Sequence, residues 1–326
     1  MRCEVPPVAR RTLVPLLELL AVLFLVSIGV SLLLSLVPGD PAVAILGEGR
    51  TPEEYEALRE RLGLNDPFLS RYGDWLGGVL TGDLGTSLVP PQTGVLDRIV
   101  SAMPVSLELA LLGLTMALLI AVPLAMWSAY YQGGRTDRAI SAVTFALLSM
   151  PSFLIGLLLI AVLVNSLDLF PRNEWVRPGD GLWSNLTHAF LPALTIALME
   201  AAMFTRILRA DLVTTLHEDF ILAARARGMS PLRIMVSDAL RPSSFSLVTV
   251  LGLSIGRLVG STVIVEYLFA LPGMGKLVID AANQGNYPVV QGAVLVIAVI
   301  YVGSNALIDR SYGLLDPRTR RARAHT

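Results

Sequence analysis

The chain has few of the cysteine, histidine and charged residues on which disulfide-rich proteins and many enzymes depend. Its 326 residues include a single cysteine, Cys3, which excludes an intrachain disulfide framework and a cysteine-based zinc site. The three histidines, His188, His217 and His325, lie far apart, so a histidine-rich metal site is not expected. Charged residues make up only 16% of the chain, whereas 54% are hydrophobic. This composition is too apolar for an ordinary soluble domain and is typical of a protein with several membrane spans.

No motif for nucleotide hydrolysis or for another reaction is complete. The P-loop-like string ALPGMGKL, at residues 270–277, has Ala270 where the phosphate-binding pattern needs glycine and Leu277 where it needs serine or threonine. His217-Glu218 does not begin a metalloprotease helix, because Ile221 stands where the second histidine should be. No Ser-His-Asp pattern was found. The chain is therefore not expected to be an enzyme or to hold a metal or cofactor of its own.

Six apolar segments are long enough, or nearly so, to cross a bilayer as helices, which takes about 20 residues. The first has 25 residues, too many for the apolar core of a signal peptide (about 7–15 residues), and is interpreted as a retained span. The fourth has only 16 residues and needs flanking residues to complete it. The sequence predicts an all-α polytopic membrane protein, a single domain over residues 1–326, with spans at residues 13–37, 105–127, 139–164, 190–205, 245–267 and 289–308.

Basic residues are concentrated on one side of these spans. Of the 25 lysine and arginine residues, 16 fall in the amino-terminal end, the loops 128–138 and 206–243, and the tail. Of the 26 acidic residues, 14 fall in the loops on the other side. Because loops rich in lysine and arginine stay in the cytoplasm, both termini are predicted to be cytoplasmic and the loop 38–104 external.

The external loop 38–104 contains the string TPEEYEALRERLG, which predicts a short amphipathic helix. Thr51 is the expected N-cap, Glu54 its capping-box partner and Gly63 the terminator. The helix could be a docking platform for a partner, or it could only pack against the chain's own helices, and both alternatives stay open. Its apolar stripe consists of Tyr55, Leu58 and Leu62.

Charges inside membrane spans are costly and are usually functional or paired. Glu18 and Glu266 lie near span ends, where their side chains can extend to the interface. Arg257 lies near the middle of the fifth span and, with Glu200, is a candidate for the substrate pathway. It could take part in a proton relay, hold a substrate carboxylate, or form an internal ion pair with a glutamate. The charged residues in the spans are Glu18, Glu108, Glu200, Arg257 and Glu266.

The cytoplasmic loop 206–243 has the residues of a compact helical element rather than of a flexible linker. Glu218 and Asp219 stand at the predicted start of a helix, where acids favour the helix dipole. Gly228 can adopt a positive φ and end that helix. Ser230-Pro231 then provides a cap and a first-turn proline for a second helix over about residues 231–240.

The first of these helices is interpreted as a docking element. Phe220, Ala224 and Gly228 recur at a spacing of four, which places them on one face. Small residues would let another surface approach closely, and arginines could pair with acids on that surface or with lipid headgroups. The candidate docking residues are Glu218, Asp219, Phe220, Ala223, Ala224, Arg225, Arg227 and Gly228.

The stretch EDFILAARARGMSPLRIMVSDALRPS, residues 218–243, resembles the cytoplasmic EAA-type loop of binding-protein-dependent ABC importer permeases. In the peptide-importer branch, Phe220-Ile221 matches a Tyr-Val pair, residues 224–228 match an Ala-Arg-Ala-Lys-Gly core, and residues 239–241 match a closing Ala-Leu-Arg. The chain is similar to the first permease subunit of the dipeptide, oligopeptide and nickel importer family. Further strings agree in order along the chain: VPGDPA, EALRERLGLNDP, GDLGTS, SMPSF, VEYLFALPGMGKLV, YPVVQG and LLDPRTR.

The resemblance implies a type I ABC importer permease fold in a bacterial inner membrane. It implies a homologous second permease, two cytoplasmic ATPases that bind ATP and magnesium, and an extracytoplasmic binding protein that delivers the substrate, with no nucleic acid involved. The helix 218–228 would be the coupling helix that ATPase closure moves. The external segment LFALPGMG, residues 268–275, would gate the pathway or contact the binding protein through Phe269, Pro272, Gly273 and Gly275.

Some positions depart from this family pattern, and the substrate stays open. Arg257 stands where relatives more often have a small or neutral residue, and Leu222-Ala223 replaces a frequent basic-Thr pair. Peptides are the expected substrate. Nickel chelates and oligosaccharides use the same architecture, however, and an ATP-independent secondary transporter is a further alternative.

Overall fold

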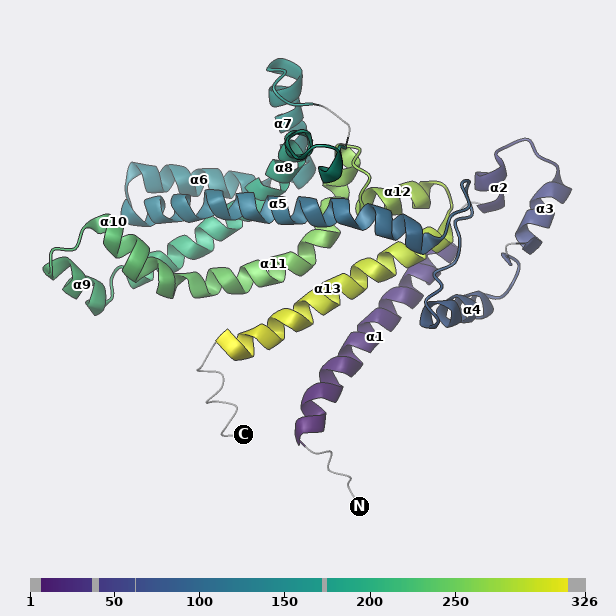
Figure 1. Cartoon of the computed structure of the whole chain (residues 1–326), viewed down its shortest axis with the longest axis horizontal. Coiled ribbons are helices and arrows are strands. Elements are labelled where there is room, and N and C mark those ends of the chain that lie inside the picture. Colours follow the sequence, from purple (N-terminus) through teal and green to yellow (C-terminus); the bar gives the residue numbers. More distant parts are fainter. Residues whose placement is uncertain (1–6, 37–40, 62, 172–174, 316–326) are drawn as a thin grey trace. The chain divides into compact units, whose positions relative to one another are not determined.

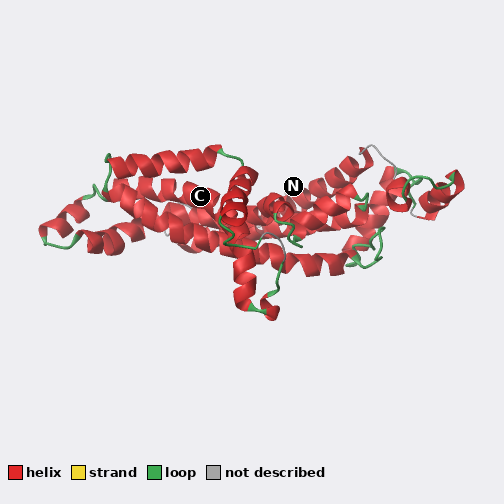
Figure 2. Cartoon of the chain, turned by 90° about the horizontal axis from the view of Figure 1, so that it is seen from above, coloured by secondary structure: helices red, strands yellow, loops and turns green. Residues whose placement is uncertain are grey.

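The structure is a computed structural model that describes residues 7–36, 41–61, 63–171 and 175–315. Over these ranges the chain folds into helices joined by turns and loops, and its only bridge is an isolated pair between Thr86 and Gly94 (Figures 1 and 2). The all-α prediction is confirmed. Part of VPGDPA, most of the tail string LLDPRTR, and Leu62 of the apolar stripe lie outside the described residues.

Five of the described helices, or helical runs, are long and apolar enough to cross a membrane. A sixth span is counted if the bent pair α6 (Arg135–Ser149) and α7 (Ser152–Leu159), with the π-helical continuation η1 (Ile160–Ser166), is one span. The five are α1 (Pro7–Leu36), α5 (Val95–Tyr130), α8 (Leu182–Thr215), the run from α10 (Pro231–Arg233) into α11 (Leu240–Leu268), and α13 (Tyr287–Leu315).

The segment predicted as a third span, residues 139–164, is broken in the middle. Helices α6 and α7 meet at an angle of 108°. The break falls at Pro151, which has no N–H to donate, and the preceding Met150 is extended with ψ of 138°. Proline is tolerated inside many membrane helices, but Pro151 divides the predicted span 139–164 into two helices.

The loop predicted over residues 206–243 is more helical than expected. Helix α8 continues to Thr215, which supplies the flanking residues that the short fourth span needs. The second cytoplasmic helix, expected over residues 231–240, is not separate. It starts at α10 and continues through the π-helical turn η3 (Ile234–Ala239) directly into α11.

The contacts of the chain divide it into two compact units. Unit 1 contains residues 1–105 and 272–306, and unit 2 contains residues 106–271 and 307–326. The single domain predicted over the whole chain stays a prediction.

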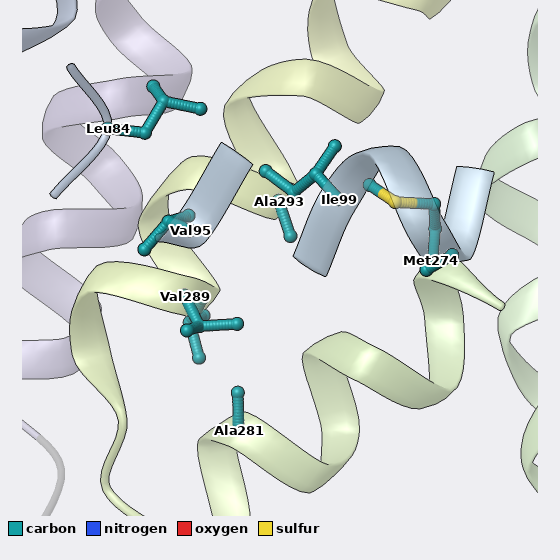
Figure 3. Close-up of a cluster of buried hydrophobic side chains, with 9 residues drawn as sticks. Leu84, Val95, Ile99, Met274, Ala281, Val289 and Ala293 are labelled. Carbon is teal, nitrogen blue, oxygen red and sulfur yellow. The ribbon is translucent and has the colours of Figure 1, made fainter. Parts of the chain in front are cut away.

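The core of unit 1 forms where the first turns of α5 meet α12 (Met274–Asn283) and α13. Val95 and Ile99 pack there with Met274, Val289 and Ala293, all of them nearly inaccessible to solvent (Figure 3). A Cβ at Gly292 would come within 2.6 Å of the Val95 side chain, so only glycine lets these two helices approach this closely.

The loop 38–104, predicted to be external, contains three further helices, α2 (Pro41–Leu46), α3 (Pro52–Arg61) and α4 (Phe68–Leu80). The predicted capping box of α3 is confirmed. The Thr51 N–H donates to Glu54 Oε2 at 2.9 Å, and the Glu54 N–H donates to Thr51 Oγ1 at 3.3 Å. Gly63 follows with a φ of +62°. The Tyr55 hydroxyl donates to the Gly47 carbonyl at 2.7 Å, which ties α3 to the end of α2.

Helix α8 is the central element of unit 2. It packs against α6, α7 and α11, and Phe204, Leu208 and Leu212 on it are fully buried. At Gly113 on α5, a Cβ would come within 2.9 Å of the Ile196 side chain on α8. Close packing on several sides makes α8 the helix to which the others of this unit attach.

Candidate functional site

The candidate docking helix is present as α9 (Asp219–Ala226), between α8 and α10. Figure 1 shows α9 and α10 at the end of unit 2 where α8 finishes and α11 begins. Glu218 is the extended N-cap residue and Asp219 lies in the first turn, although the Glu218 side chain makes no capping hydrogen bond. Two carboxylates at this end are favourable, because the first backbone N–H groups carry partial positive charge.

Gly228 ends α9, as predicted. Its φ is +75°, a conformation that favours glycine, and its N–H donates to the Arg225 carbonyl at 2.9 Å. The Met229 N–H donates to the Ala224 carbonyl at 3.3 Å. These two bonds form a Schellman motif, which satisfies the last carbonyls of the helix and fixes the direction in which the chain leaves it.

Helix α9 has one face inside the molecule and one face outside. Ile221 is fully buried and Ala224 is 1% exposed, whereas Phe220 is 48% exposed and Leu222 is 52% exposed. The expectation that Ala224 offers a surface to a partner is therefore wrong, since that side is taken up by packing within unit 2. The remaining candidate docking residues are exposed: Glu218, Asp219, Phe220, Ala223, Arg225, Arg227 and Gly228.

Beside α9, the end of α5 and the start of α10 expose further apolar side chains. Leu232, just after the turn, is 72% exposed, and Trp127 at the end of α5 is 58% exposed. A hollow of about 640 Å³ lies between α9 and the end of α5, lined among others by Tyr130, Leu222 and Arg225. Apolar side chains beside arginines, on a face without cover, are typical of a surface that contacts another protein.

A charged cluster that the sequence did not reveal joins three helices near this end of unit 2. Arg209 on α8 donates from Nε to Asp137 Oδ1 at 2.6 Å and from Nη2 to Asp137 Oδ2 at 2.7 Å. Ser128 on α5 donates to Asp137 Oδ1 at 2.6 Å, and the Gly133 N–H donates to Oδ2 at 2.8 Å. The bidentate pair holds the start of α6 to the part of α8 that leads into α9. Sequence patterns only counted Arg209 among the cytoplasmic arginines, because a pair 72 residues apart leaves no local signal.

The two candidate pathway residues meet in unit 2. Arg257 Nη2 on α11 donates to Glu200 Oε1 on α8 at 2.8 Å and to Oε2 at 3.1 Å, and the Ser254 hydroxyl donates to Glu200 Oε2 at 3.0 Å. The internal ion pair, one of the three alternatives for Arg257, is therefore present. The Glu200 side chain is only 10% exposed, but that of Arg257 is 50% exposed.

Half of the Arg257 side chain thus remains on the surface of unit 2, in the middle of a membrane helix. A guanidinium open to lipid tails would be strongly unfavourable, so this side of α11 has to face water or another protein. The exposed part of the Arg257 guanidinium can accordingly bind an anionic group while Glu200 holds the side chain in place.

Glu266 departs from its expected role. It was expected to extend from the end of its span to the interface, but its side chain is fully buried, and the Ser106 hydroxyl donates to its Oε1 at 2.6 Å. The link connects α5 to α11 within unit 2. Glu18, the other glutamate expected at a span end, is exposed.

The external gate candidates fall into different parts of the chain. Phe269 is buried at the end of α11, in unit 2, and is followed by Ala270 with a φ of +55°. Pro272, Gly273 and Gly275 belong to unit 1, at the start of α12, where Gly273 is the extended N-cap residue. Of these four residues only Pro272 is exposed, so it alone is open to a partner in this structure.

Helices of this length and composition define the class, a multi-pass membrane protein. The chain belongs to the family described as binding-protein-dependent transport system inner membrane component, whose model matches residues 121–321. A second model, for the N-terminal part of these membrane components, matches residues 8–110. The predicted family is confirmed. The chain is thus a permease of a binding-protein-dependent ABC importer in the inner membrane, which works with partner ATPases and a binding protein.

Named relatives agree over nearly the whole chain. The oligopeptide transport system permease protein AppB of Bacillus subtilis (strain 168) is 34% identical, over 95% of this chain and 98% of the relative. The di/tripeptide transport system permease protein DppB of Pseudomonas aeruginosa (strain UCBPP-PA14) is 33% identical, over 89% and 93%.

A solved structure shares the fold. The crystal structure of an amino acid ABC transporter with histidines matches with a TM-score of 0.50 at 17% identity, covering 68% of this chain and 94% of that one. The match supports the predicted ABC permease architecture, and at this identity it extends to the fold alone.

Proposed function

We propose that this chain forms half of the translocation pathway of an ATP-driven importer for di- or oligopeptides. The observation that carries the proposal is α9, a short helix fixed on one face and exposed on the other. A cytoplasmic ATPase would contact its exposed face, with Phe220 and Leu222 as the apolar contacts and Arg225 and Arg227 as the charged ones.

The connections of α9 support a mechanical role. Helix α8 ends at Thr215, just before α9, and the chain after the Gly228 turn continues without a break from α10 into α11. The same two helices carry Glu200 and Arg257, which are joined by the ion pair. A displacement of α9 by an ATPase would therefore reach both helices that hold the charged pair.

Peptides are the proposed substrate, because the two relatives named above are permease proteins of an oligopeptide and a di/tripeptide transport system. These names favour peptides over nickel chelates and oligosaccharides. The half-exposed guanidinium of Arg257 could bind a peptide carboxylate in the pathway, since arginine pairs well with carboxylates in poorly hydrated surroundings.

The remaining assembly is also proposed. A homologous second permease would complete the pathway, and two ATPases would dock, one on each permease and each with its own ATP and magnesium. Both termini would lie in the cytoplasm, as the distribution of basic residues predicts. The external segment around Phe269, Pro272, Gly273 and Gly275 would then meet the binding protein or gate the pathway.

Transport by the reconstituted complex tests the proposal. The two permeases, the ATPases and the binding protein are placed in proteoliposomes, and uptake of a radiolabelled dipeptide is compared with uptake of a nickel chelate and an oligosaccharide. We expect uptake of the peptide only. This uptake should require the binding protein, and it should require ATP on the side of the membrane where the ATPases lie. Uptake of nickel or sugar instead, or peptide uptake without ATP, would contradict the proposal.

A further inference from the structure

A pocket of about 290 Å³ lies in unit 1, whereas α9 and the pair of Glu200 and Arg257 belong to unit 2. It is an open pocket, lined by the last turns of α1, by α4 and the segment before it, and by the first turn of α13. Its volume is close to the lower end of the range for small-molecule sites, about 300–1,000 Å³, which suits a ligand of few residues rather than a protein segment. The residues that determine its chemistry are Asp66, Phe68, Arg71, Tyr72, Asp74 and Trp75.

One wall of the pocket is aromatic and fixed. Phe68 and Tyr72 are stacked with ring centroids 6.1 Å apart and 11° between the ring planes, and Trp75 lies 6.1 Å from Tyr72. The Tyr72 hydroxyl is hydrogen-bonded to Ser27 Oγ on α1 at 2.8 Å, which anchors this wall to the neighbouring helix. The rings form a preformed surface for an apolar group.

Two donors on the same helix lack acceptors. Arg71 Nε and Trp75 Nε1 are both buried, and neither has a hydrogen-bond partner within the described part of the chain. They lie four residues apart on α4, hence on one side of the helix, and both residues line the pocket. A buried donor without a partner is unfavourable, so an acceptor that reached these two groups from the pocket, such as a carboxylate, would be stabilised there.

The rim of the pocket carries the opposite charge. Asp66 and Asp74 also line it, and both are exposed. No ion pair between either of them and Arg71 forms in the described structure. A ligand with only negative charge would be repelled by these carboxylates, whereas a ligand with a carboxylate and an ammonium group matches donors and acids at once.

From these contacts we propose that the pocket beside α4 is a binding site for a small zwitterion, namely a free dipeptide with an apolar side chain. Its carboxylate binds Arg71 and Trp75, its ammonium group faces Asp66 and Asp74, and its side chain packs on Phe68 and Tyr72. The identification of the zwitterion as a peptide rests on the proposed function. The site would hold peptide on unit 1 in addition to the pathway around Arg257.

A zwitterionic lipid headgroup has the same pair of charges, but the shape of α4 favours a ligand from water. Leu69 is 74% exposed and Leu80 is 81% exposed, and the helical period places them on the flank of α4 opposite Arg71. If that apolar flank contacts the membrane, the flank with Arg71 and Asp74 is turned away from it.

Binding of a dipeptide to the full-length permease tests the proposal. The permease, in nanodiscs of phosphatidylglycerol without binding protein, is titrated with Ala-Phe by calorimetry. The same titration is done with N-acetyl-Ala-Phe-amide, which has no charged ends. We expect saturable binding of Ala-Phe and at least tenfold weaker binding of the capped compound. Equal binding of the two, or no saturable binding of Ala-Phe, would overturn the proposal.

Variants assign the binding to this pocket. Arg71→Gln removes the charge, and Trp75→Phe keeps an aromatic ring, though a smaller one, but removes the N–H, so the second change tests the donor with little risk to folding. Each should weaken binding at least tenfold, whereas Arg50→Gln, at an exposed arginine of the same unit, should leave it unchanged. Unchanged binding in both pocket variants would refute the assignment.

Two further arms separate the remaining outcomes. Glycerophosphoethanolamine should compete weakly or not at all, and competition stronger than that of Ala-Phe would show a lipid headgroup site instead. Uptake of Ala-Phe by the complete wild-type complex is measured in parallel. Uptake without binding at this pocket would overturn the present inference alone, whereas absence of all peptide uptake would overturn the proposed function.

Discussion

Arg257 shows how a single charged side chain can be both structural and open to a ligand. It neutralises the buried Glu200, yet half of its surface remains uncovered in unit 2. A charge in a membrane helix is retained only where it is compensated, and here one carboxylate compensates it on one side. The uncovered side is the part that a substrate or the second permease could use.

At this position Arg257→Leu should lower peptide uptake by about tenfold or more, since a charge-assisted hydrogen bond contributes about 1.5–3 kcal/mol. Arg257→Lys, which keeps the charge but cannot form the fork, should retain intermediate uptake. Initial rates in proteoliposomes measure the effect, with the amount of folded permease checked by gel filtration. If Arg257→Leu folds and transports like the wild type, Arg257 has no part in the pathway.

Some residue contacts could be predicted from the sequence and others could not. The capping box of Thr51 and Glu54 and the positive φ of Gly228 are local, so a few neighbouring residues determine them. The pair of Asp137 and Arg209, and the burial of Glu266, depend on how distant helices pack. The spacing of residues within one helix does not predict contacts between helices that are distant in sequence.

At the scale of elements, α9 shows why a short helix leaves its orientation open. In a helix of only two turns, the spacing of four between Phe220 and Ala224 does not determine whether their side of the helix is exposed or buried. Packing decided it, because Ile221, adjacent to Phe220, takes the buried position. In the same way the continuous run from α10 into α11, and the 108° bend after α6, follow from tertiary contacts and from Pro151.

The neighbouring residues Phe220 and Ile221 allow a matched test of the two faces. Phe220→Ala should leave the stability of the permease within about 0.5 kcal/mol, since the side chain is exposed, but should weaken ATPase association by about tenfold or more. Ile221→Ala should instead destabilise the permease by about 2–5 kcal/mol, because it leaves a cavity. Thermal unfolding and co-purification with the ATPase measure the two effects. A Phe220→Ala permease that retains the ATPase in full would exclude this residue from the docking surface.

At the scale of the whole molecule, the distribution of basic residues predicts the orientation in the membrane. The test uses single cysteines in a Cys3→Ser background, placed at Glu53 on α3 and at Ala226 on α9, both of which are exposed. A membrane-impermeant maleimide added to intact cells should label Glu53→Cys at once and Ala226→Cys only after permeabilisation. The reverse pattern would invert the proposed topology and remove α9 from the reach of a cytoplasmic ATPase.

The loop 218–243 and seven further strings in order along the chain indicated the family from sequence, and the family and fold are confirmed. The arrangement of the site was less accessible. Composition and hydropathy locate spans because the bilayer imposes a length and an apolar surface on each of them. They do not indicate which helix is central, as α8 is in unit 2, nor that α8 and α11 join α9 to the charged pair.

If an ATPase moves this permease through α9, a change at Gly228, which ends that helix, allows the most direct measurement of the coupling. Gly228, with a φ of +75°, and Gly47, with a φ of +76°, both have open space around the position of a Cβ. Valine should therefore impose similar backbone strain at each, about 1–2 kcal/mol. ATP-dependent peptide uptake is measured in proteoliposomes for Gly228→Val and for Gly47→Val. We predict that Gly228→Val lowers uptake by tenfold or more and that Gly47→Val transports nearly as the wild type does. Equal uptake by the two variants would show that α9 does not transmit the action of the ATPase.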